Sequence, residues 1–124
     1  MFEYEINGKI YEQKKLVWGQ LNQLVDKLKG IEFRSDMTAV ELIGILGDRV
    51  PSVLSVVLTE KGGSVKDKDI EALASEFEFT VEFEVALQVI EDFFDCNPTA
   101  SYLNKIGELV GKMTSEVEKA SGNL

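Results

Sequence analysis

The first thirteen residues alternate between apolar and polar side chains in two short runs that Asn7-Gly8 separates. Asn-Gly is the preferred pair for a type I′ turn, because both central positions need a positive φ that these residues reach at low cost. An isolated hairpin is only marginally stable in water, so its apolar side requires a cover from later in the chain. The expected cross-strand pairs are Phe2–Gln13, Tyr4–Tyr11 and Ile6–Lys9.

Several later stretches have the apolar spacing of helices. The first carries its stripe at Leu21, Leu24, Val25 and Leu28 and stops before Gly30, where a glycine suits a helix end. Residues 38–46 open with the spelling of a capping box, and Pro51 suits the first turn of a helix over 50–59. We expect these two helices to form the centre of the core. After the glycine-rich loop 61–69, Asp69 is a candidate cap for a short helix.

Residues 76–85 fit two patterns. Phenylalanine and valine alternate with glutamate in EFEFTVEFEV, which alone is typical of a strand. A helical stripe over residues 83–94 and the candidate N-cap Thr80 instead predict a short extended piece at 77–79, followed by a helix over about 80–95. We favour the helix, because a third strand beside the hairpin would add further glutamates to the acidic side of the ribbon.

The Asn97-Pro98 pair ends that helix, because proline disfavours helical backbone in the residue before it. A last helix over about 99–113 follows, and the polar residues 115–124 are expected to fray. The sequence thus predicts a mainly α fold, a helical bundle of about five to six helices with an N-terminal β-hairpin packed on it. The expected single domain spans 1–124, with the hairpin at 1–13 and the bundle at 16–113.

Composition narrows the class of protein. The chain has 124 residues, of which 44% are hydrophobic and 28% charged, as in an ordinary globular domain. Its net charge of −9 argues against binding nucleic acid or an anionic membrane surface, since both need clustered lysine and arginine. The longest uncharged stretch is far shorter than the roughly 20 apolar residues of a membrane span. A single cysteine, Cys96, and the lack of a signal-peptide pattern favour a cytoplasmic protein.

Nothing in the sequence has the pattern of a catalytic, cofactor or metal site. Histidine is absent, which removes the commonest general base and the usual nitrogen ligand of metals. Gly62-Gly63-Ser64 lacks the phosphate-loop spelling, and Asp67-Lys68-Asp69 misses the spacing of a calcium loop. Glu91, Asp92 and Asp95 are expected on a solvated helix face opposite the aromatic stripe. We therefore expect no catalytic residue, no cofactor and no metal.

Aromatic residues are in surplus between residues 77 and 102, and both core packing and an exposed protein-binding patch remain open for them. Two helices joined as tightly as 80–95 and 99–113 are expected to leave a groove between them. For Phe94, burial in the core is the competing interpretation. The predicted partner-binding residues of this groove are Phe94, Tyr102, Ile106 and Val110, with Asp95 and Glu108 at its rim.

Three segments carry a resemblance to a known family. An "x-NGK-x-Y" turn occupies Ile6–Tyr11, a helix of the form "L-x-x-G-Q-L-x-x-L" occupies Leu16–Leu24, and "V-I-E-D-F-F-x-x-N" occupies Val89–Asn97. In this order, and over about residues 2 to 110, the chain resembles the tail assembly chaperones of long-tailed bacteriophages and prophages.

The resemblance implies a non-enzymatic role in the cytoplasm of a bacterial host cell. Proteins of this family bind the long, helical tape measure protein and help tail-tube subunits assemble around it. A longer form made by ribosomal frameshifting is typical of the family, and this chain would be the short form. The alternatives are a structural or tail-completion component that stays in the virion, and a small hydrolase that uses the carboxylates near residue 92.

The predicted groove leads to a first testable expectation. Replacing Tyr102 by alanine together with Ile106 by serine should weaken binding to the tape measure protein while thermal stability falls only modestly. Residues of a true core would instead cost about 2 to 5 kcal/mol for each truncation. Binding and thermal melting of the double variant check this expectation, and a variant that unfolds, or that binds as tightly as the parent, would contradict it.

Overall fold

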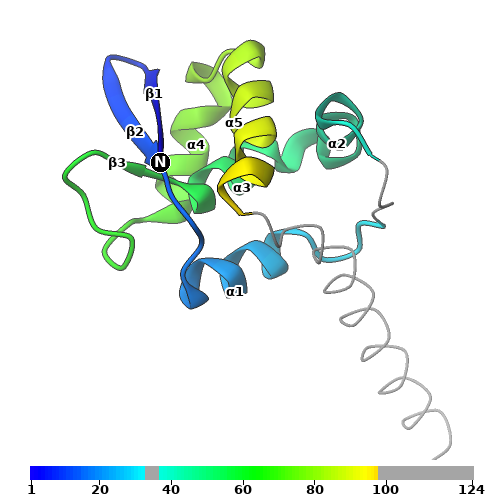
Figure 1. The fold of residues 1–124 in the computed structure, drawn as a ribbon, viewed down its shortest axis with the longest axis horizontal. Coiled ribbons are helices and arrows are strands. Elements are labelled where there is room, and N and C mark those ends of the chain that lie inside the picture. The colour runs from blue at the N-terminus through cyan, green and yellow to red at the C-terminus, as the bar shows by residue number, and fades with distance from the viewer. Residues whose placement is uncertain (33–36, 98–124) are drawn as a thin grey trace, which may run out of the picture.

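The computed structural model describes residues 1–32 and 37–97, which form a set of helices with a small antiparallel sheet at one side of them (Figure 1). Strands β1 (Phe2–Ile6) and β2 (Lys9–Gln13) are joined by the Asn7-Gly8 turn, where both residues have positive φ, 53° and 77°. The predicted hairpin register is confirmed. Its pairs include Phe2–Gln13, Tyr4–Tyr11 and Ile6–Lys9.

Two of the described helices, α2 (Ala39–Leu46) and α4 (Ile70–Thr80), begin at side-chain caps. Thr38 accepts a hydrogen bond from the Glu41 backbone N–H, and the Glu41 side chain reaches back, so the predicted capping box is confirmed. Asp69 accepts a hydrogen bond from the Ala72 backbone N–H and caps α4, also as predicted. The elements are α1 (Trp18–Lys27), α2 (Ala39–Leu46), the 3-10 turn η1 (Gly47–Arg49), α3 (Val50–Val57), α4 (Ile70–Thr80) and α5 (Phe83–Cys96).

The predicted fold class, a bundle of about five to six helices with a two-stranded hairpin, is wrong. The described residues form a three-stranded antiparallel sheet of order β1-β2-β3 together with α1 to α5. The third strand, β3 (Leu58–Glu60), comes from the end of the segment assigned to a helix over 50–59. Helix α3 ends at Val57 because Leu58 turns to extended backbone, with φ −103° and ψ 137°, and pairs with Gln13 of β2.

Within residues 76–85 neither a strand nor an extended piece at 77–79 forms, so those two predictions are wrong, whereas the helix predicted over about 80–95 is present as α5, with Glu82 and not Thr80 as its N-cap. Helix α4 continues through Thr80, whose hydroxyl donates to the Glu76 carbonyl one turn earlier. The helical structure is interrupted only at Val81 and Glu82, and α5 begins at the next residue. In this helix Phe77 is buried, with its ring centroid 5.1 Å from that of Tyr11, whereas Phe79 is exposed. The predicted helix over 99–113 and the tail 115–124 lie outside the described residues.

The core lies between the inner face of the sheet and helices α3, α4 and α5. Helix α3 is its centre, as predicted, since Val53, Leu54, Val56 and Val57 are all buried. Helix α2 is less central than predicted: Leu42 and Leu46 are buried, but Val40 and Ile45 are exposed. Within the described residues no helix is long and apolar enough to cross a membrane.

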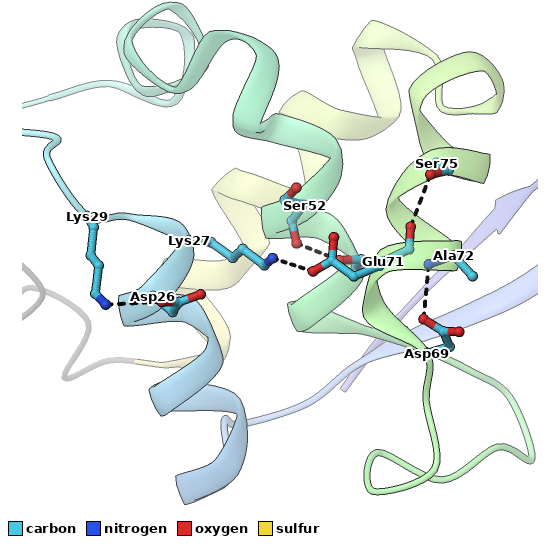
Figure 2. A network of polar contacts seen from close by, with 9 residues as sticks. Asp26, Lys27, Lys29, Ser52, Asp69, Glu71, Ala72 and Ser75 are labelled. Carbon is cyan, nitrogen blue, oxygen red and sulfur yellow. Dashed lines mark hydrogen bonds and ion pairs between the residues drawn. The ribbon is translucent and has the colours of Figure 1, made fainter.

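Polar contacts join both ends of helix α1 to other elements of the fold. Lys27 forms an ion pair of 2.6 Å with Glu71 in the first turn of α4, beside the Asp69 cap (Figure 2). Arg49 of η1 donates to the backbone carbonyl of Lys29, just after α1. At the other end, the Asn97 amide oxygen accepts a hydrogen bond of 2.9 Å from the Leu16 N–H. The end of α5 is thereby held beside the start of α1.

Candidate protein-binding surface

The carboxylates near residue 92 do not share one solvated helix face. Asp92 is buried, contrary to the predicted solvated face, and accepts a 2.8 Å hydrogen bond from the Tyr4 hydroxyl. Gln88 donates to its other oxygen, while Glu91 and Asp95 point to solvent. Burial, followed by the hydrogen bond to Asp92, raises the pKa of the Tyr4 hydroxyl. This network joins α5 to β1 inside the core.

Cys96 is buried at the end of α5, with its Sγ 3.9 Å from the Gln13 carbonyl. Gln13 is also fully buried, and its amide nitrogen donates to the Tyr4 hydroxyl at 2.8 Å and the Val89 carbonyl at 3.1 Å. The described residues contain no group of three or more histidine, cysteine, aspartate or glutamate side chains that could hold a metal. The thiol belongs to the packing of β2 on α5.

A cavity of about 420 Å³ lies between β3, the loop after it and α4, with Tyr11 and Lys68 among its lining residues. The Lys68 ammonium donates 2.8 Å hydrogen bonds to the carbonyls of Val56 and Leu58, where α3 turns into β3. Its cation therefore occupies the C-terminal end of α3, where a positive charge is favourable. Lys68 therefore holds the α3–β3 junction together as well as lining the cavity.

Burial lowers the pKa of Lys68 to about 8, below the ordinary value of a lysine. Above pH 8 the unfolded chain binds more protons than the folded one, so the free energy of unfolding should rise with pH. The rise should stop near pH 10, because burial raises the pKa of Tyr4 and Tyr11 and reverses the sign there. Urea unfolding between pH 7 and 10 checks this, and Lys68→Met should remove the rise. A free energy of unfolding that falls steadily over this range in the parent protein would contradict it.

Exposed aromatic side chains gather on α5 and at the end of α4. Phe79 of α4 is 87% exposed, and on α5 Phe83 is 59% and Phe94 38% exposed. With 3.6 residues per turn, Phe83, Leu87 and Phe94 fall within about 40° of one another around the axis of α5. We call these three residues the α5 stripe. Leu87 is half-buried, and the opposite side of the helix carries the core residues Val89, Phe93 and Cys96.

An acidic row borders the α5 stripe on one side. Glu84, Glu91 and Asp95 fall within about 40° of one another, next to the stripe and away from the core residues of the helix. All three are exposed, and none of them forms an ion pair with another described residue. The helix thus presents an apolar row and an anionic row side by side to solvent.

The charge of the whole chain is concentrated in this region. Residues 69–97 contain nine acidic side chains and no basic one, whereas the rest of the sequence contains thirteen of each sign. The acidic segment, as we call residues 69–97, therefore accounts for the full net charge of −9. Such a one-sided charge on α4 and α5 creates a field that attracts cationic groups.

Of the four predicted partner-binding residues, the structure places one. Phe94 lies on α5 with its ring edge against Phe93, 5.5 Å between centroids, and about a third of it is in solvent. Tyr102, Ile106 and Val110 lie outside the described residues. The sequence did not identify Phe83 as exposed or Leu87 as only half-buried, because all apolar residues of the helix were assigned to one stripe. That stripe spans more of the helix circumference than a single core-facing side can bury. Its width could have indicated that some of its residues are exposed.

Comparison of the chain with protein-family models, with curated proteins and with solved structures gives no match.

Proposed function

We propose that this chain is a non-enzymatic protein-binding module, a cytoplasmic tail assembly chaperone of a bacteriophage or prophage that binds the tape measure protein. The observation that carries the proposal is the α5 stripe, three apolar side chains on one side of a helix that no described residue covers completely. Exposed apolar rows of this kind are typical of surfaces that receive the apolar face of a partner helix. The sequence resemblance supplies the identity of the partner.

The position of the α5 stripe suits a chaperone. A surface that binds a partner has to be apolar, but the stability of the fold must not depend on its burial, since it is exposed whenever the partner is absent. The core side of α5 is held separately, through Asp92 to Tyr4 and through Val89 to Gln13. The core side of α5 thus has anchoring contacts that do not involve the α5 stripe.

Co-expression with the tape measure protein encoded near this chain tests the proposal. We expect the tape measure protein to become more soluble and to co-purify with the chain. If it does neither, the proposal is wrong. Mass spectrometry of purified particles separates the chaperone from a structural tail component, because a chaperone should be absent from the finished virion and a component should be present.

A further inference from the structure

We propose that α5 binds a basic amphipathic helix, whose apolar face covers the α5 stripe while its lysines and arginines lie along Glu84, Glu91 and Asp95. This inference rests on the proposed function, and it adds the chemical class of the segment that is recognised. It concerns the charge of the partner and the direction from which that charge approaches.

The stripe defines the size of the bound segment. Phe83 and Phe94 are eleven residues apart, which corresponds to about 16 Å, or three turns, along α5. A partner helix of three to four turns covers this length with apolar residues at every third or fourth position. Aromatic side chains at both ends of the row are the residue type that dominates binding energy at such interfaces.

The acidic row favours a partner helix with positive charge on its flank. The row is free of ion pairs among the described residues, and residues 69–97 provide no lysine or arginine that could neutralise it. A partner with acidic or neutral flanks would leave these carboxylates uncompensated, or would place like charges beside them. A helix with basic residues on the corresponding flank satisfies them and associates faster through the field of the acidic segment.

The test uses two labelled peptides with identical leucine positions, one with lysines and one with glutamates on the flank. Binding to the full chain is measured by fluorescence anisotropy at low and at high salt. We expect the lysine peptide to bind and the glutamate peptide not to. The double variant E84K/E91K should bind the lysine peptide at least tenfold more weakly than the parent chain does. The matched control E3K/E5K changes the net charge equally on the outer side of β1 and should alter binding less than twofold.

The outcomes distinguish this inference from the function on which it rests. Equal effects of E84K/E91K and E3K/E5K, or no effect of either, would overturn the basic-helix inference. If the tape measure protein still co-purifies in that case, the chaperone function stands. A parent chain that binds neither peptide, while a variant with Ile106→Ser and Leu109→Ser binds the lysine peptide, would show that the chain's own C-terminal segment occupies the stripe and would also overturn it. Circular dichroism confirms that each variant is folded.

Discussion

Replacing Phe77 by alanine is expected to lower the free energy of unfolding by about 3 to 5 kcal/mol, a large part of the stability of a small domain. Phe77 is 1% exposed and packs edge-on against Tyr11, so its loss leaves a cavity between α4 and the sheet. Urea unfolding followed by circular dichroism measures the change. A large effect is expected because the ring is almost fully buried and packs on Tyr11 of β2.

Phe79→Ala is the matched control for Phe77→Ala. The two residues lie on the same helix and have the same chemistry, but Phe79 is 87% exposed and its loss should change stability by no more than about 0.5 kcal/mol. The pair also separates helix from strand, since residues two apart share one face of a strand and not of a helix. Similar losses for both variants would contradict the assignment of α4.

Replacing both Phe83 and Phe94 by serine should abolish binding of the tape measure protein. Each aromatic residue that acts as a binding hot spot contributes about 2 kcal/mol or more, so the two together correspond to a loss of roughly a thousandfold in affinity. Thermal stability should change little, because both side chains are exposed on the solvent side of α5. Co-purification and titration against the tape measure protein measure the effect.

The control for this double variant is Ile10→Ser, which removes an exposed apolar side chain from the outer side of β2. It should leave binding unchanged. Loss of binding in both variants would indicate a general effect of surface hydrophobicity and not a site on α5. Retained binding in Phe83→Ser with Phe94→Ser would place the surface elsewhere.

Local signals in the sequence predicted what depends on local chemistry. Asn7-Gly8 specified the turn and therefore the cross-strand pairs, and the side chains of Thr38 and Asp69 marked the starts of α2 and α4. In each case the determining contact joins residues within a few positions of one another. These features need no knowledge of the tertiary structure.

The errors came from features that depend on distant residues. Leu58 continues the apolar helical spacing of α3. It nevertheless lies in a strand, where it pairs with Gln13 of β2 and its carbonyl accepts a hydrogen bond from the Lys68 ammonium. Asp92 lies among apolar neighbours because Tyr4, 88 positions away, supplies its hydrogen bond. For the binding surface, the sequence identified Phe94 but not Phe83, since spacing alone does not tell which part of a wide apolar stripe meets the core.

Site-specific photo-cross-linking to the tape measure protein tests directly whether α5 is the binding surface. A photoreactive phenylalanine analogue is placed at position 87, within the α5 stripe, or at position 5, on the outer side of β1, and the complexes are irradiated. The account predicts a cross-linked product from position 87 and none from position 5. A product from position 5 alone, or from neither position in a complex that has been shown to form, would contradict the assignment of α5 as the binding surface.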